Sequence, residues 1–257
     1  MLMPRAVLRR HGRVRWALTQ TLIVAVAVFF YFQVRGLTNA DPSVAVRHAH
    51  RLMDLEQWLG LRFELAVQAR VIAYDTLYDV ANWIYVWGHW PVIVVTMVWL
   101  ALQHRHVFLR LRDGMLVSGA LGLVVFVTYP VAPPRLVDPK LVDTVTERSE
   151  AYRYLQPPNF VNQYAALPSL HAGWDLLVGI SIATAAGTLL WRVIGWILPV
   201  LMALAVVATA NHYVVDVIAG VALALIGHLA ALRLEQRRAS AARPAPHRER
   251  QPVGTHP

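Results

Sequence analysis

Six mostly apolar runs of about 20 residues divide this chain, and they constrain its fold more than any other feature. A helix of this length is what crosses the hydrocarbon core of a bilayer. Apolar residues make up 57% of the 257 and charged residues only 15%, whereas soluble domains carry about 25% charge. We therefore predict an all-α, polytopic membrane protein, built as a bundle of six transmembrane helices. The runs are Trp16–Val34, Ala81–Leu102, Gly114–Ala132, Ala172–Leu190, Val193–Ala210 and Tyr213–Leu232.

The segment between the first two runs is mixed in polarity. Leu52, Leu55 and Leu59 recur at helical spacing among charged residues, which predicts an amphipathic helix. Its expected place is the membrane interface or the end of the bundle. A plain helical connector and a lid over a site both fit this pattern.

The ends of the chain are basic. Five arginines precede the first run, as in a signal peptide, but the run is close to full span length and ends in aromatic residues that suit signal peptidase poorly. We predict an uncleaved first span and three parts: a cytoplasmic basic N-terminus (1–15), one six-span membrane domain (16–232) and a disordered basic cytoplasmic tail (233–257). The tail is rich in Arg, Ala and Pro and has no apolar period.

Basic residues predict the orientation. With both termini in the cytoplasm, the inside segments hold 15 of the 24 Lys and Arg residues in a minority of the loop length, as the positive-inside rule requires. The net charge of +9 is then explained by anionic lipid. No basic patch is interleaved with aromatic residues, so we expect no nucleic-acid partner. Nothing in the sequence indicates an oligomeric state.

Three polar motifs lie at ends of the apolar runs. Arg135 follows the third run, His171 begins the fourth, and His212 and Asp216 stand where the sixth begins. On the predicted topology all three motifs face the extracytoplasmic side. The i, i+4 spacing of His212 and Asp216 puts them on one helical face, where a carboxylate can fix the imidazole tautomer and leave its other nitrogen reactive.

Each motif also has a structural interpretation. Arg135 can snorkel to the interface, and His171 can bond a loop carbonyl at a helix start beside Ser169, a residue typical of caps. His212 and Asp216 can form a pair that only holds two helices together. His89 lies near the same end of the second run, but nothing pairs with it in the sequence.

The motifs Pro168-Ser169-Leu170-His171 and His212-Tyr213-Val214-Val215-Asp216 resemble those of the type-2 phosphatidic acid phosphatase superfamily. Together with the Pro130–Arg135 segment, they look most like its inositol phosphorylceramide synthase branch, whose members are inositolphosphotransferases. The resemblance is clearest over residues 80–232.

The resemblance implies a lipid phosphatase or phosphotransferase. His212 would attack phosphorus and carry a phosphohistidine, Asp216 would orient His212, and His171 would protonate the leaving oxygen and then act as base. Arg135 would neutralise phosphoryl charge, and Ser169 is a further candidate substrate ligand. A phosphorylated lipid in the bilayer would be the substrate, and no metal or other cofactor is implied.

The chain departs from the superfamily pattern at two cations. Thr128 stands where the first motif usually has a lysine, and Val206 where the third usually has an arginine. The long loop before His171 offers Lys140, Arg148 and Arg153 in their place. The alternatives to an enzyme are a catalytically inactive lipid-binding or scaffold protein of the same fold, and a transporter in which His and Asp relay protons. A transporter should carry these groups near the bilayer midplane, whereas here they stand at helix ends.

Overall fold

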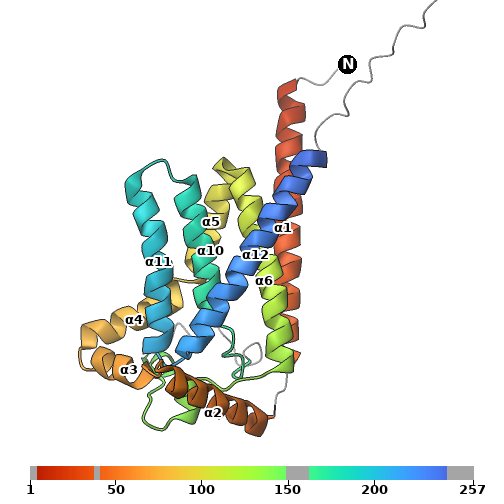
Figure 1. The fold of residues 1–257 in the computed structure, drawn as a ribbon. Helices are drawn as coiled ribbons and strands as arrows, with labels where there is room; N and C mark the ends of the chain where they lie inside the picture. Colours follow the sequence, from red (N-terminus) through yellow and green to blue (C-terminus); the bar gives the residue numbers. More distant parts are fainter. Residues whose placement is uncertain (1–4, 38–40, 149–161, 242–257) are drawn as a thin grey trace, which may run out of the picture.

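The computed structural model describes residues 5–37, 41–148 and 162–241, and over these ranges the chain is all-α, as predicted. Most of the long helices run side by side as one bundle, and α2, α3 and α4 lie at one end of it (Figure 1). The helices are α1 (Arg5–Leu37), α2 (Pro42–Leu59), α3 (Glu64–Ile72), α4 (Asp75–Trp87), α5 (Trp90–Gln103), α6 (Arg105–Thr128), α7 (Pro134–Val137), α8 (Thr144–Arg148), α10 (Leu170–Ala185), α11 (Leu189–Ala208) and α12 (Val214–Ala241).

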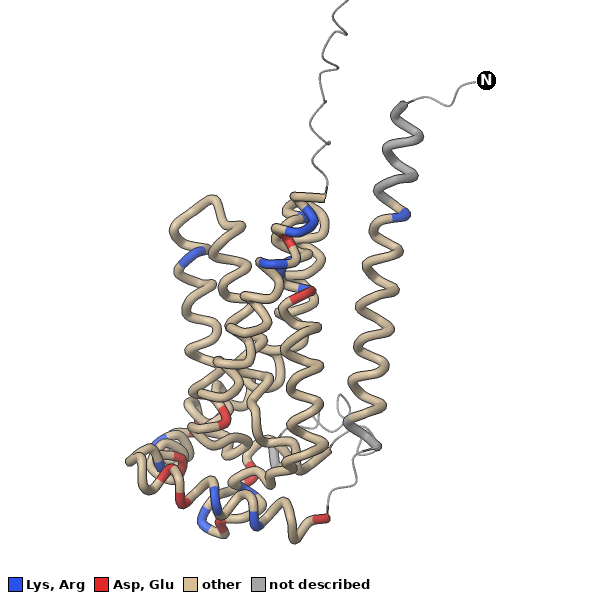
Figure 2. The backbone as a smooth tube through the Cα atoms, turned by 45° about the vertical axis from the view of Figure 1, so that its right-hand side comes forward, with Lys and Arg blue, Asp and Glu red and all other residues tan. Residues whose placement is uncertain are grey.

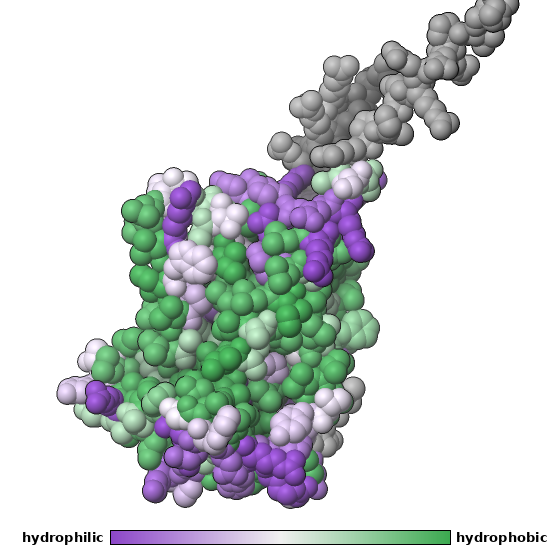
Figure 3. Space-filling model, in the orientation of Figure 1, coloured by the Kyte–Doolittle hydropathy of each residue, from purple (hydrophilic) through white to green (hydrophobic). Residues whose placement is uncertain are grey.

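The surface is that of a membrane protein. Among the described residues, α6, α11, α12 and the Val14–Val34 part of α1 are long and apolar enough to cross a bilayer, and α4 with α5 would make a fifth crossing if counted as one span. The shorter α10 is also apolar. Apolar residues form a broad band between two polar ends (Figure 3), and charged residues gather toward those ends (Figure 2).

The second predicted run, Ala81–Leu102, is a broken helix. α4 and α5 meet at 47° across Gly88 and His89. The break has a local cause, because Pro91 has no N–H to continue the α4 hydrogen-bond ladder and glycine favours an interruption. It also brings His89 to the end of the bundle where the motif residues lie.

Several other boundaries differ from those predicted. The segment 103–113, predicted as a loop, is largely helical, because α6 begins at Arg105 and ends before the predicted Ala132. α12 continues past Leu232 to Ala241, into the segment predicted as a disordered tail, of which 242–257 lies outside the described residues. Ion pairs across these two helices, Arg110–Glu235 at 2.8 Å and Arg238–Asp113 at 2.5 Å, explain why both extend.

The turn between the fourth and fifth runs is also displaced. α10 ends at Ala185 rather than Leu190, and α11 begins at Leu189, so Arg192 lies in the first turn of α11 rather than between helices. Gly187 and Thr188 occupy the turn, and both residue types favour helix termini.

α6, α10 and α12 touch almost backbone to backbone. A Cβ on Gly220 of α12 would lie 2.0 Å from the Ser169 carbonyl oxygen, and one on Gly173 of α10 would lie 2.5 Å from that of Gly220. Such small residues let membrane helices approach closely. The first turns of α10 and α12, which carry His171 and Asp216, are therefore fixed against each other.

Helix α2 is amphipathic, but its buried face differs from the one predicted. Leu52 is buried together with Ala45, Ala49 and Glu56, whereas Leu55 and Leu59 are exposed. Pairing of the Ala45 carbonyl with the Ala132 N–H at 3.2 Å fixes this register. α2 crosses the end of the bundle beneath the start of α12 (Figure 1).

Candidate active site

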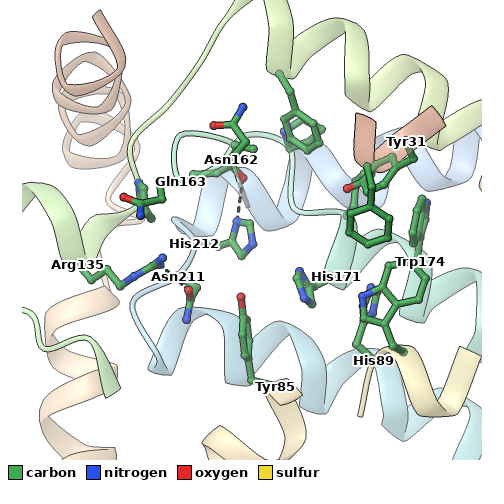
Figure 4. Close-up of a pocket in the computed structure, with 18 residues that line it drawn as sticks. Tyr31, Tyr85, His89, Arg135, Asn162, Gln163, His171, Trp174, Asn211 and His212 are labelled. Atoms are coloured by element: carbon green, nitrogen blue, oxygen red, sulfur yellow. Dashed lines mark hydrogen bonds between the residues drawn. The ribbon is translucent and has the colours of Figure 1, made fainter. Parts of the chain in front are cut away.

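One pocket at this end of the bundle gathers three of the predicted residues. Arg135, His171 and His212 line it, from α7, α10 and the segment just before α12. Their side chains point toward a common space (Figure 4). Asp216 is completely buried behind His212.

A backbone carbonyl and a carboxylate hold the His212 ring. Its Nδ1 lies 2.8 Å from the carbonyl oxygen of Ala166 and 3.4 Å from Asp216 Oδ2. Because a carbonyl oxygen can only accept, Nδ1 must carry the hydrogen. The Nε2 lone pair of the neutral ring is then available for attack on an electrophile or for taking up a proton.

Asp216 is oriented by the chain it caps. Its Oδ2 accepts the N–H of Tyr213 at 2.9 Å, and its backbone carbonyl accepts the N–H of Ser169 at 2.9 Å. Asp216 Oδ1 is buried without a hydrogen-bond partner among the described residues. The carboxyl group thus tightens the start of α12 and lies beside the His212 ring.

His171 lies among aromatic rings. Its ring stacks on Tyr85 at 4.9 Å between centroids and lies 4.2 Å from the ring of His89 and 5.9 Å from that of His212. Figure 4 shows His171 between Tyr85 and His89. The His171 and His212 rings are tilted by 54° to each other, and both line the same pocket.

Ser169 has a structural contact behind the pocket wall. It is fully buried, and its Oγ accepts the Ala172 N–H at 3.4 Å as the N-cap of α10. The cap explains why a helix begins just before His171. Its predicted contact with substrate stays a prediction.

Arg135 is the one Lys or Arg among the described residues that line this pocket. Its Nη1 donates to Asn211 Oδ1, its Nε donates to Asp143 Oδ2 at 3.1 Å, and its backbone N–H bonds the Ala210 carbonyl at 3.1 Å. The bonds to Asn211 and Ala210 tie Arg135 to the segment that carries His212.

The other predicted cations are placed differently. Lys140 is exposed and lines a neighbouring cavity with Arg62. Arg148 ends α8, but its side chain lies outside the described part of the chain, as does all of Arg153. Their roles stay predictions. Thr128 bonds its own helix through the Val124 carbonyl, and Val206 is fully buried, so neither position replaces a cation.

A second histidine–carboxylate pair was not predicted. His89 Nδ1 lies 2.8 Å from Asp175 Oδ1, and both side chains are almost completely buried. A sequence signal existed, because Asp175 is an acid inside an apolar run, four residues after His171. Ionisable residues in such runs are costly and usually have a partner or a function. The partner is 86 residues away and could not be identified from spacing.

Asn162 adds a hydrogen-bond donor to the pocket. Its Oδ1 accepts the Tyr164 N–H at 2.9 Å, while its Nδ2 is buried without a partner among the described residues. A buried donor without a partner is unfavourable, and an anion in the pocket would satisfy it. Nothing in the local sequence distinguishes this residue from other loop asparagines.

Two further carboxylates from α2 and α3 cap α12. Glu64 accepts the Val214 N–H at 3.1 Å and Glu56 accepts the Val215 N–H at 2.8 Å. Burial, together with the charge of Glu64, raises the pKa of Glu56 to about 8. Burial also raises the pKa of Tyr213, whose hydroxyl donates to the Ala132 carbonyl. Within the described residues, no group of three or more His, Asp or Glu is arranged to hold a metal ion.

The family model of the PAP2 superfamily matches residues 50–230 of the chain. No curated protein and no solved structure gives a significant match. The matched segment carries every pocket residue described above, whereas the pocket residues of α1 precede it.

Proposed function

Because this chain belongs to the PAP2 superfamily, whose members generally hydrolyse phosphate esters, we propose that it is a membrane enzyme that cleaves the phosphate ester of a lipid. The observation that carries the proposal is the meeting of Arg135, His171 and His212 around one pocket, with the two imidazole rings 5.9 Å apart. The superfamily supplies the reaction class, and the pocket supplies groups that suit it.

In the proposed first step, the Nε2 lone pair of His212 forms a bond to phosphorus while the bond from phosphorus to the lipid oxygen breaks. His171, as imidazolium, gives its proton to that oxygen. Arg135 and the Asn162 amide stabilise the phosphoryl oxygens, where charge is spread in the transition state. The products are a free lipid alcohol, a phosphohistidine and a neutral His171.

In the second step, water attacks phosphorus and gives a proton to His171, and the bond from phosphorus to His212 breaks. An alcohol can replace water in this step without any change in the residues used. The alternative to hydrolysis is therefore transfer of the phosphoryl group to an inositol-type alcohol, as in the branch that the motifs resemble. Neither step as written uses a metal ion.

Two apolar grooves favour a lipid substrate. One groove, between α1 and the α4–α5 bend, is lined by Phe32, Trp87, Pro91 and Val94 and reaches His171. A second groove, between α1, α5 and α6, reaches Trp174, whose ring stacks on that of His89. Hydrocarbon chains in these grooves would place a phosphate at the membrane surface, next to the histidines.

The substrate test uses purified protein in vesicles with a panel of lipid phosphates and matched water-soluble phosphate esters. Phosphate release and transfer to added alcohols are followed together. We expect turnover of at least one lipid phosphate and much slower turnover of the soluble esters. Absence of turnover on every ester would reject the enzyme and leave a non-catalytic lipid-binding protein.

We further propose six crossings, with α4–α5 and α10 as the remaining two, both termini in the cytoplasm and the pocket outside. The start of α1 and the end of α12 lie at the same end of the bundle, opposite α2 (Figure 1), as an even number of crossings requires. The chain has no cysteine, so Lys140→Cys and Ser240→Cys give labels without background. In intact cells an impermeant thiol reagent should label only the first. Equal labelling, or labelling of the second alone, would reject this orientation.

A further inference from the structure

The buried pair of His89 and Asp175 lies next to the pocket and has no part in the two steps above. The exposed fraction of each side chain is only 3–4%. A separation of 2.8 Å between a ring nitrogen and a carboxylate oxygen requires a proton between them. Burying such a pair carries a desolvation cost that the attraction between its members often does not offset, so its presence calls for an explanation.

The pair connects directly to His171. Asp175 is on α10 four residues after His171, and this i, i+4 spacing puts both on one face of the helix. His89, from the break between α4 and α5, joins them, because its ring contacts that of His171 at 4.2 Å between centroids. His89 lines the pocket, whereas Asp175 lies behind it.

The arrangement parallels that of His212. There, Asp216 follows the histidine by four residues and lies 3.4 Å from its Nδ1. Around His171 the carboxylate instead bonds a second imidazole, and that imidazole contacts the histidine of the pocket. An acid–base histidine alternates between a cationic and a neutral ring. A nearby carboxylate stabilises the cationic form, because its negative charge offsets that of the protonated ring.

We propose that His89 and Asp175 are positioning residues for His171: Asp175 orients His89 and offsets the charge of protonated His171, and His89 supports the His171 ring. This inference rests on the proposed function, because it assigns the pair to the proton-transfer half of that reaction. Formation of the phosphohistidine stays assigned to His212, with Asp216 beside its ring.

The competing explanation is purely structural, with the pair joining α5 to α10. The two differ in a measurable way. A pair that acts through His171 matters when the leaving oxygen needs a proton and matters little when the leaving group departs as an anion. A pair that only holds the helices together would slow both reactions to the same extent.

The experiment compares Asp175→Asn and His89→Gln in the full-length protein in vesicles. The substrates are the best lipid phosphate and an activated aryl phosphate. We expect kcat/KM for the lipid to fall about tenfold or more and that for the aryl ester to change less than about threefold. Ser181→Ala, in the same helix nearly two turns deeper and bonded to the Leu177 carbonyl, is the matched control and should leave both unchanged.

A double-mutant cycle completes the test. Combined with His171→Ala, Asp175→Asn should cost the lipid reaction no more than about twofold further, because the effect passes through a residue already removed. Equal loss on both ester classes, independent losses that multiply in the double variant, or no loss in either single variant would overturn the inference. If Asp175→Asn does not fold, His89→Gln supplies the same comparison. Failure of the proposed function is distinguishable, because the wild-type protein would then cleave neither ester.

Discussion

The two histidines of the pocket have different neighbours. His212 is held by a carbonyl and a carboxylate, where α10 and α12 touch backbone to backbone. His171 is held by the rings of Tyr85 and His89, beside a groove between α1 and the α4–α5 bend. A nucleophile needs one fixed tautomer, whereas an acid–base group must gain and lose a proton in each cycle. The two hydrogen-bond acceptors beside Nδ1 of His212 fix its tautomer, as the nucleophile role requires.

The largest effect is expected at His212. His212→Ala removes the attacking nitrogen, so turnover of every ester should fall by about 10⁴-fold or more, whatever the leaving group. Steady-state assays on the lipid phosphate and the aryl phosphate measure this loss. Residual turnover of the aryl ester near the wild-type rate would place the nucleophile elsewhere.

His171→Ala should separate the two roles. The lipid reaction should fall by about 10²–10⁴-fold, because an alkoxide leaves poorly without a proton. For the aryl ester, kcat/KM, which reports phosphorylation of His212, should stay near the wild-type value, whereas kcat should fall because the second step has lost its base. A plot of log kcat/KM against leaving-group acidity should be steeper for this variant than for the wild type, and parallel plots would contradict the assignment.

Asp216→Asn probes how His212 is fixed. In a triad where the carboxylate alone sets the tautomer, this exchange can cost about 10⁴-fold. Here the Ala166 carbonyl is the nearer partner of Nδ1, so the tautomer survives and a loss of only about 10–100-fold is expected. A loss as large as that of His212→Ala would show that the carbonyl contact does not suffice.

The smallest effect concerns stability. In the unfolded chain Glu56 has its ordinary pKa near 4.5, while burial raises it to about 8 in the folded protein. The folded state therefore retains a proton that the unfolded state has released, so this contribution to stability is fully present below pH 4.5 and is lost as the pH rises through about 8.

Glu56→Gln should remove that dependence, because an amide oxygen can still accept the Val215 N–H and carries no charge at any pH. Thermal unfolding from pH 5 to 9 should show a decline in the wild type and a flatter profile in the variant. Gln57→Glu, on the next position of the same helix, is an exposed control. Identical profiles for wild type and Glu56→Gln would contradict the shifted pKa.

Several features of the fold and of the pocket were predictable because they depend on local sequence. Apolar runs predicted an all-α membrane bundle, and the i, i+4 spacing placed His212 and Asp216 on one face. The broken α4–α5 segment and the pairing of His89 with Asp175 depend on contacts between distant helices, which periodicity does not encode. The Ala166 carbonyl was missed for the same reason, since any residue in the loop offers a carbonyl.

The early start of α6 and the extension of α12 were missed for a related reason. Charged residues ended the predicted apolar runs, but in the fold Arg238 and Asp113 pair across helices and keep both segments helical. Composition alone marks such residues as loop or tail, whereas tertiary pairing stabilises them in a helix.

The most direct test of the division of roles is to identify the phosphorylated atom. His171→Ala, incubated with the activated aryl phosphate and quenched quickly in alkali, should accumulate a phosphoenzyme that peptide mapping and ³¹P spectroscopy can locate. We predict phosphate on Nε2 of His212, because Nδ1 is occupied by the Ala166 carbonyl and Asp216. Phosphate on Nδ1 of His212, or on His89 or another residue, would contradict the account.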